Sequence, residues 1–163
     1  MGQEIERKFL VIGDAWRALG EPVSIRQGYL CSGPERVVRV RMAGDHAWLT
    51  VKGVNFGATR REYEYAIPLA EAAEMLEIDG FCERPLIEKR RTRIPVGELT
   101  WEVDEFLGDN AGLIVAEVEL RHAEQRVELP DWLGAEVTGD PRYYNSNLLA
   151  HPFTRWGKED SSL

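Results

Sequence analysis

Apolar and polar residues alternate along eight segments of this chain, which is the period of a β-strand that buries one face. The first segment places Glu4, Glu6 and Lys8 on one face. Ile5 and Phe9 lie on the opposite face. Turn-forming residues separate several neighbouring segments, which favours antiparallel pairing. The predicted strands are residues 4–11, 24–30, 36–42, 47–52, 60–68, 86–95, 99–107 and 113–120.

Helical spacing interrupts the strands in a few places. Residues 69–78 are rich in good helix formers, and Gly80 follows this segment where a helix commonly ends. Asp14 is a candidate N-cap for a short helix after the first strand. The shorter predicted helices are residues 15–19, residues 123–127, and residues 144–150 beginning at Asn145 or Ser146.

Two segments lack a regular pattern. Residues 53–59 contain two glycines and are predicted to form a mobile loop, and the tail from Lys158 is predicted to fray. Nothing between the strands resembles a domain linker. The 163 residues are therefore predicted to form one domain, residues 1–163.

The polar faces of the strands carry charged residues in tight groups of one sign. Successive positions on one face of a strand lie about 6.5–7 Å apart. Two carboxylates at that distance repel by about 2.4 kcal/mol at an effective dielectric of about 20, which a cavity must offset with cations. The acids are Glu4, Glu6, Glu62, Glu64, Glu102, Asp104, Glu117 and Glu119, and the bases are Lys8, Arg39, Arg41, Lys52, Lys89, Arg91 and Arg93.

Two architectures fit this pattern. An open sheet would show the polar face to water and bury the other face against the helices. A closed eight-stranded antiparallel β-barrel, an α+β fold with helices packed on the outside, would gather the charges in a polar lumen with room for one small ligand. The grouping of acids on four strands favours this closed tunnel. A transmembrane barrel shares the polarity, but helices interleaved with the strands favour a soluble one.

Composition and net charge limit the kinds of molecule that the protein is expected to bind. The formal net charge of −8 argues against a protein that binds nucleic acid. Cys31 and Cys82 are isolated and are expected to be reduced thiols in a cytoplasmic protein, with a single disulfide as the alternative. No segment reaches the roughly 18 apolar residues of a membrane helix, so no membrane association is expected. The sequence is compatible with a homodimer.

A lumen lined by both charges suits a phosphate chain with a metal ion. Arginine offers a bidentate fork to phosphate, and lysine offers a point charge. Carboxylate pairs suit Mg²⁺ or Mn²⁺, which prefer oxygen ligands and share them with substrate phosphates. Metal and polyanion together would offset the repulsion within the lumen.

A series of short motifs runs through the chain and begins with Glu4-x-Glu6-x-Lys8. That motif alone is weak, because any amphipathic strand can supply it. The later motifs are Val38-Arg39-Val40-Arg41, Thr50-Val51-Lys52-Gly53, Arg61-Glu62-Tyr63-Glu64, Glu88-Lys89-Arg90-Arg91, Trp101-Glu102-Val103-Asp104-Glu105-Phe106, Ala116-Glu117-Val118-Glu119-Leu120 and Tyr143-Tyr144-Asn145-Ser146-Asn147-Leu148. In composition and order, the whole series resembles the CYTH, or triphosphate tunnel metalloenzyme, superfamily.

The resemblance implies an eight-stranded tunnel that binds a triphosphate chain with Mg²⁺ or Mn²⁺. Lys52, with Tyr29 as its neighbour, would assist the transfer as the catalytic pair. Glu102 and Arg93 share the inward face and are weaker candidates. By position, phosphate would contact Lys8, Arg39, Arg41, Lys52, Lys89 and Arg91, and metal would be held by Glu4, Glu6, Glu62, Glu64, Asp104, Glu117 and Glu119.

The reaction expected on this basis is metal-dependent hydrolysis of a phosphoanhydride of inorganic triphosphate, giving pyrophosphate and phosphate. Other activities within the superfamily are alternatives, namely thiamine, nucleoside or RNA triphosphatase and class IV adenylate cyclase. A polyphosphate- or nucleotide-binding module without turnover is the alternative from a different class. In each case the expected partner is a triphosphate, a small molecule in all but the RNA alternative.

Overall fold

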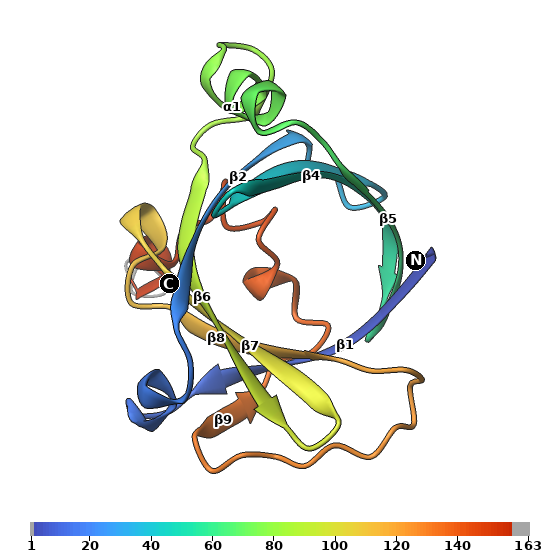
Figure 1. The fold of residues 1–163 in the computed structure, drawn as a ribbon, viewed down its shortest axis with the longest axis vertical. Coiled ribbons are helices and arrows are strands. Elements are labelled where there is room, and N and C mark those ends of the chain that lie inside the picture. The colour runs from blue at the N-terminus through green and yellow to red at the C-terminus, as the bar shows by residue number, and fades with distance from the viewer. Residues whose placement is uncertain (1, 158–163) are drawn as a thin grey trace.

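A computed structural model describes residues 2–157 of the chain (Figure 1). Within this range the chain forms nine strands, one α-helix and four short 3-10 helices. The strands are β1 Gly2–Val11, β2 Pro22–Cys31, β3 Val37–Ala43, β4 His46–Phe56, β5 Thr59–Ala66, β6 Ile87–Val96, β7 Leu99–Phe106, β8 Ile114–Glu119 and β9 Leu133–Glu136. The helices are α1 Leu69–Glu77, η1 Ala15–Leu19, η2 Gly108–Asn110, η3 Pro141–Tyr143 and η4 Phe153–Arg155.

The first eight strands close into an antiparallel barrel, which confirms the predicted tunnel fold (Figure 1). Around the barrel the order is β1-β5-β4-β3-β2-β6-β7-β8 and back to β1. Strand β1 completes the ring, because residues 2–5 pair with β5 and residues 6–10 pair with β8. The later part of β1 also pairs with β9, which therefore lies outside the ring.

The largest apolar cluster lies on the outer wall of the barrel. Trp101 and Val118 project outward from β7 and β8 and have no exposed surface. Trp16 of η1 and Trp132 before β9 cover them. Because side chains alternate along a strand, burying these faces on the outside directs the alternate polar residues into the lumen.

Helix α1 covers a second part of the outer wall, over β3 and β4 (Figure 1). Its buried residues Ala72 and Leu76 pack in one cluster with Val40 and Ala47 of those strands. The inner face of the same part of β3 carries Arg39 and Arg41. Packing of α1 therefore supports the strand that presents two of the predicted phosphate ligands.

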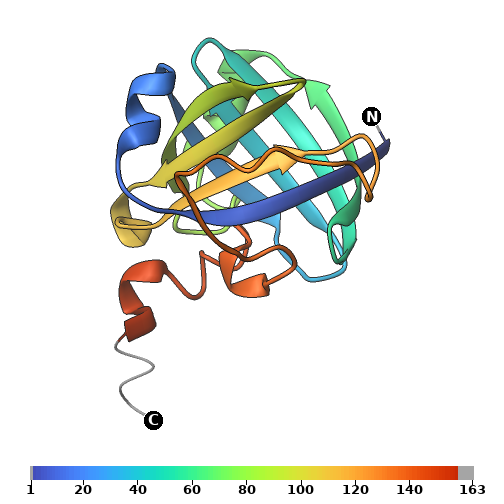
Figure 2. The same ribbon diagram turned by 90° about the horizontal axis from the view of Figure 1, so that it is seen from below.

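The chain beyond β9 runs beneath one end of the barrel (Figure 2). Leu148 in this segment has no exposed surface and packs in a cluster with Tyr29, Val37 and Phe106. The segment of residues 138–150 therefore closes that end of the bore with side chains that contact the barrel wall.

Two local predictions before α1 differ from the structure. Residues 53–59 are not a loop but the tip of a hairpin, in which β4 continues to Phe56 past a bulge between Lys52 and Asn55. Gly57 has φ of 60° there, which allows a tight two-residue turn. Asp14 precedes η1 as predicted, but its carboxylate accepts from the Arg17 side chain and not from the helix backbone.

Two predicted helices near the C-terminus are wrong. Residues 123–127 contain a single turn, in which the Gln125 amide nitrogen donates to the His122 carbonyl. Residues 144–150 form successive turns, because Asn145 turns its side chain into the barrel and does not cap a helix. The predicted frayed tail from Lys158 lies outside the described residues. Within residues 2–157, the helices are too short or too polar to cross a bilayer.

Candidate active site

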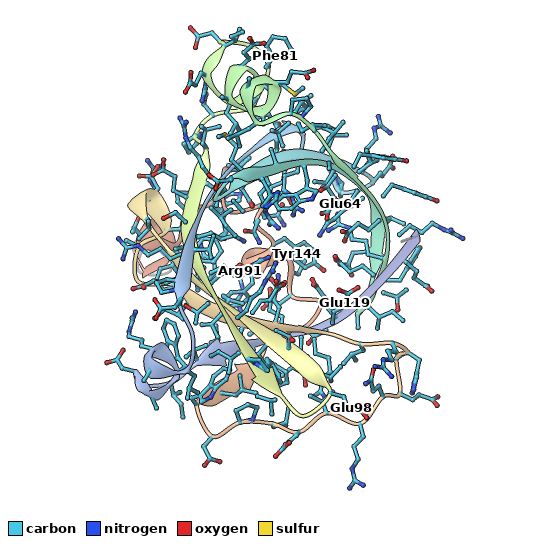
Figure 3. All side chains as sticks on the ribbon, viewed as in Figure 1. Glu64, Phe81, Arg91, Glu98, Glu119 and Tyr144 are labelled. Carbon is cyan, nitrogen blue, oxygen red and sulfur yellow. The ribbon has the colours of Figure 1, made fainter. Side chains whose placement is uncertain are left out.

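The barrel encloses a cavity of about 240 Å³ whose wall is mostly charged. Arg91, Glu64 and Glu119 point into the bore, with Tyr144 among them, whereas Glu98 points away (Figure 3). The lining cations are Lys8, Arg39, Arg41, Lys52, Arg60, Lys89, Arg91 and Arg93, and the lining carboxylates are Glu4, Glu6, Glu62, Glu64, Glu102, Glu117 and Glu119. The other lining residues are Tyr29, Val37, Asn55, Tyr144, Asn145 and Ser146.

Exposure of the side chains along β6 shows the depth of the bore. The exposed fraction of the side chain is 0% for Lys89, 9% for Arg91 and 69% for Arg93. Lys89 also donates to Asn145 of the C-terminal segment. The cavity is therefore closed near Lys89 and opens to solvent near Arg93.

Strand pairing brings charged groups from different strands face to face. Lys8 of β1 lies opposite Glu117 of β8, and their Nζ and Oε1 atoms are 3.4 Å apart. Glu6 lies opposite Glu119 in the same ladder. Burial and then the charges of Glu117 and Glu4 raise the pKa of Glu6 well above its usual value. These carboxylates repel one another, so a cation between them would be stabilised.

A second acidic group surrounds Lys52. Its ammonium lies 3.2 Å from Glu4 Oε1 and 3.7 Å from Glu62 Oε2. Burial, and then the hydrogen bond shared with Glu4, raises the pKa of Glu62 to about 7. Glu62 Oε2 is buried and accepts no hydrogen bond. One lysine therefore faces two carboxylates, and one carboxylate oxygen remains available to another donor or ion.

Asp104 is placed differently from the other predicted metal ligands. It is buried behind the lining, and Arg91 donates to its two oxygens at 2.7 and 2.9 Å. Lys89 donates to Oδ2 at 2.7 Å. Burial alone would raise the pKa of Asp104, but the charges of Arg91 and Lys89 hold it well below its usual value. Three hydrogen bonds to its two oxygens orient both cations, and the role of Asp104 as a metal ligand stays a prediction.

Glu64 faces the cationic side of the cavity. Arg39 donates to the hydroxyl of Thr50 at 3.2 Å, and that hydroxyl donates to Glu64 at 3.1 Å. Arg39 and Glu64 are themselves 3.7 Å apart. The three residues lie side by side on β3, β4 and β5, so strand register fixes their contact.

Arg41 differs from its neighbours because its partner is neutral. Its Nε donates to Gln27 Oε1 at 2.7 Å. Burial, together with the charges of Arg39 and Arg91, lowers the pKa of Arg41 to about 9. A guanidinium held among other cations is well suited to receive a polyanion.

The predicted catalytic neighbours Lys52 and Tyr29 both line the cavity. They contact different groups, however. Lys52 lies beside Glu4 and Glu62, whereas the Tyr29 hydroxyl accepts a hydrogen bond from the side-chain amide of Gln27 at 2.9 Å. The predicted pairing of Lys52 with Tyr29 is therefore not seen among the contacts of the described residues.

Several polar residues of the site were not predicted. Arg60 shares the inward face of β5 with Glu62 and Glu64, so the two-residue period could have found it. Thr50 and Gln27 are uncharged, and a search for charged pairs passes over them. Asn55 faces inward only because the bulge in β4 shifts the alternation.

Carboxylates crowded beside buried cations suit Mg²⁺ or Mn²⁺, and Glu62 Oε2, which lies 3.7 Å from the Lys52 ammonium without a hydrogen bond, fits such an ion. Among residues 2–157, however, no three Asp, Glu, His or Cys side chains are grouped closely enough to hold a metal by themselves. Mg²⁺ is commonly held by one or two carboxylates, waters and the substrate phosphates. The donor set therefore fits an ion whose coordination the substrate completes.

The fold and the site define a tunnel protein, a closed antiparallel barrel with a charged bore. In agreement, residues 2–144 match the CYTH domain. The chain belongs to this family. The inorganic triphosphatase of Acetivibrio thermocellus is 52% identical over 153 residues, covering 94% of this chain and 97% of that protein.

Solved structures agree with this assignment. A crystal structure of an inorganic triphosphatase is 33% identical, with a TM-score of 0.61, and the match covers 91% of this chain and 95% of that one. A protein from Pyrococcus furiosus shares the fold with a TM-score of 0.58 at 19% identity, over 73% of this chain and 79% of its own.

Proposed function

We propose that this chain is an inorganic triphosphatase that hydrolyses a phosphoanhydride of triphosphate to give pyrophosphate and phosphate. The observation that carries the proposal is the enclosed cavity, in which buried cations on one side face crowded carboxylates on the other. The chain's 52% identity to an inorganic triphosphatase supports the same activity.

The size of the cavity favours a small substrate. Its volume of about 240 Å³ is below the roughly 300–1,000 Å³ of pockets for drug-sized ligands. Its wall offers charged groups throughout, and the aromatic side chains in it are two tyrosines. A compact polyanion therefore suits the cavity better than a nucleotide, whose base would need an apolar surface.

The cations are placed to bind and orient the phosphate chain. Lys8, Lys89 and Arg91 lie deep in the bore, and each is held in place by a carboxylate. Arg39 and Arg41 approach from β3. In such an enclosed, preorganised site these charges would stabilise the charge that develops on the phosphate oxygens. We assign to Lys52, which lies between Glu4 and Glu62, the role of contacting the phosphoryl group that is transferred.

We also propose that the activity depends on Mg²⁺ or Mn²⁺. The residues that would hold the ion are Glu4, Glu6, Glu62, Glu117 and Glu119, with Glu64 farther along β5 from Glu62. The ion would supply charge neutralisation and a polarised water for attack on phosphorus. The carboxylates would orient it, and the barrel wall would exclude bulk water.

Phosphate release from inorganic triphosphate tests both parts of the proposal. We expect turnover with Mg²⁺ or Mn²⁺ and none with EDTA. Glu4→Gln keeps the shape of the side chain but removes its charge. Loss of an outer-sphere partner of a metal costs up to about 100-fold, so loss of a residue that holds the ion itself should lower kcat/KM by at least about 100-fold. Glu98→Gln on the outside is the matched control and should leave kcat/KM unchanged.

The outcomes separate the alternatives. Turnover that persists in EDTA would contradict the metal dependence but not the activity. Binding of triphosphate without turnover would favour a phosphate-binding module. Faster turnover of ATP or thiamine triphosphate than of inorganic triphosphate would identify that compound as the preferred substrate.

A cytoplasmic location is part of the proposal. Cys31 and Cys82 are both free, and Cys82 is buried. Free thiols are typical of proteins in a reducing compartment. Fractionation of the native cells, with a probe for free thiols, checks this location.

A further inference from the structure

Arg41 and Arg60 differ from the other cations of the cavity because neutral groups hold them: the Gly53 carbonyl accepts from Arg60, and the Gln27 side chain accepts from Arg41. Lys8, Lys52 and Lys89 each lie within 4 Å of a carboxylate, as do Arg39, Arg91 and Arg93. Among the described residues, Arg41 has no such partner and donates instead to the amide oxygen of Gln27. Its charge is therefore not neutralised by a carboxylate in contact with it.

Gln27 has no exposed surface, and both the oxygen and the nitrogen of its side-chain amide have hydrogen-bond partners. A guanidinium can only donate, so Oε1 of Gln27 must face Arg41. The Nε2 group of Gln27 then donates to Tyr29 Oη at 2.9 Å and to Asn145 Oδ1 at 3.3 Å. Lys89, another pure donor, also donates to Asn145 Oδ1, at 2.9 Å.

This chain of contacts joins two predicted phosphate ligands through two amides. Arg41 is linked to Gln27, Gln27 to Asn145, and Asn145 to Lys89. Asn145 belongs to the segment that closes the barrel, so one chain of hydrogen bonds connects this segment to Arg41. A glutamate in place of Gln27 could still accept from Arg41, but it could not donate to Asn145 and would neutralise the guanidinium.

We propose that Gln27 is a positioning residue that holds Arg41 through a neutral amide, so that the guanidinium meets the phosphate chain with its charge unneutralised. This inference rests on the proposed function, because it assigns the charge of Arg41 to triphosphate. Gln27 itself acts through Arg41 and touches no reacting atom.

The test compares two variants of Gln27 in the full chain. Gln27→Glu should raise KM for inorganic triphosphate about tenfold or more, with kcat changed less than about threefold, because binding charge is lost. Gln27→Met keeps Arg41 charged but loses its anchor, and should raise KM less than Gln27→Glu does. If Gln27 served only to pack the wall, both variants, which keep about the same side-chain volume, would lower stability and leave KM unchanged, and that result would overturn the proposal.

A double-variant cycle checks that the effect passes through Arg41. With Arg41→Met already present, adding Gln27→Met should raise KM by less than about twofold, because the amide no longer has a guanidinium to hold. An increase as large as Gln27→Met causes in the wild-type chain would show that Gln27 acts independently of Arg41 and would overturn the proposal. Gln125→Glu, a change of equal charge in an exposed loop region, is the control and should leave KM unchanged.

Calorimetry with inorganic triphosphate in EDTA separates this inference from the proposed function. If the wild-type chain binds triphosphate but does not hydrolyse it, the proposed function fails, and the dissociation constants still test Gln27. The constant should rise in the order wild type, Gln27→Met, Gln27→Glu. Equal constants for wild type and Gln27→Glu would overturn the role of Gln27 alone.

Discussion

At the scale of single residues, Asp104 stabilises the deepest cations of the site. Arg91 and Lys89 are both buried, and Asp104 accepts hydrogen bonds from each. Removing one member of a buried ion pair leaves the remaining charge without compensation, which destabilises a protein more than loss of an exposed pair. Asp104 therefore acts on the fold and, through Arg91 and Lys89, on the site.

Asp104→Asn should lower the free energy of unfolding by about 3–5 kcal/mol, because two buried cations lose their shared countercharge. Urea denaturation followed by circular dichroism measures the change. Asp45→Asn, in the exposed turn between β3 and β4, is the control and should change stability by less than about 0.5 kcal/mol. A stable Asp104→Asn protein that loses metal-dependent activity alone would favour the original metal assignment.

The inward positions could be predicted residue by residue, because alternation decides which face a side chain occupies. Lys8, Arg39 and Glu117 follow from that rule. Their partners do not, because a contact between strands depends on register and on burial. Nothing in the local sequence distinguishes Asp104, which is enclosed by cations, from Glu102, which lines the cavity.

At the scale of elements, α1 holds the outer side of the wall that carries Arg39 and Arg41. Its contact with β3 and β4 depends on Ala72 and Leu76, the buried residues of the helix. The helix has no side-chain cap at Pro68, so packing on the barrel is a main source of its stability.

Leu76→Ala should lower the free energy of unfolding by about 2–5 kcal/mol, because it leaves a cavity between α1 and the barrel. Thermal or urea unfolding measures the loss. Glu74→Ala on the exposed side of the same helix is the matched control and should be neutral or slightly stabilising. Equal stability of the two variants would mean that α1 contributes little to the barrel.

Long periodic elements were predictable, whereas short irregular ones were not. Helix α1 has a clear helical pattern, and the structure contains it. Residues 144–150 have helix-compatible composition, but Asn145 forms hydrogen bonds with Gln27 and Lys89 across the barrel end. Such a tertiary contact overrides local propensity and leaves no trace in the periodicity.

At the scale of the whole molecule, the cavity and the outer surface carry different charge. Eight cations and seven carboxylates line the cavity, and Asp104 behind the wall brings the acids to eight. The remainder of the chain therefore carries the formal net charge of −8. Attraction of a small anion therefore depends on the local cations in the bore and not on the net charge of the chain.

Closure of the barrel was the step that strand alternation alone could not decide, although the grouping of acids on four strands favoured it. The pairing of residues 2–5 with β5 joins the two ends of the sheet, and an open sheet would show the same alternation. The motif series resolved this choice, because the whole order of motifs resembles a family of tunnels.

A closed bore predicts that triphosphate stabilises the whole molecule even without turnover. With EDTA present and triphosphate at 100 times its dissociation constant, binding should add about 2.7 kcal/mol and raise Tm by roughly 5–11 °C in a chain of this size. Differential scanning calorimetry measures the shift. Orthophosphate at equal concentration should give a smaller shift, because it spans fewer of the cations. Lys8→Met should lose most of the triphosphate shift, whereas Arg126→Ala on the exposed surface should keep it. A shift of equal size in Lys8→Met would place the anion outside the bore, since an anion inside it would lie against the cation that this variant removes.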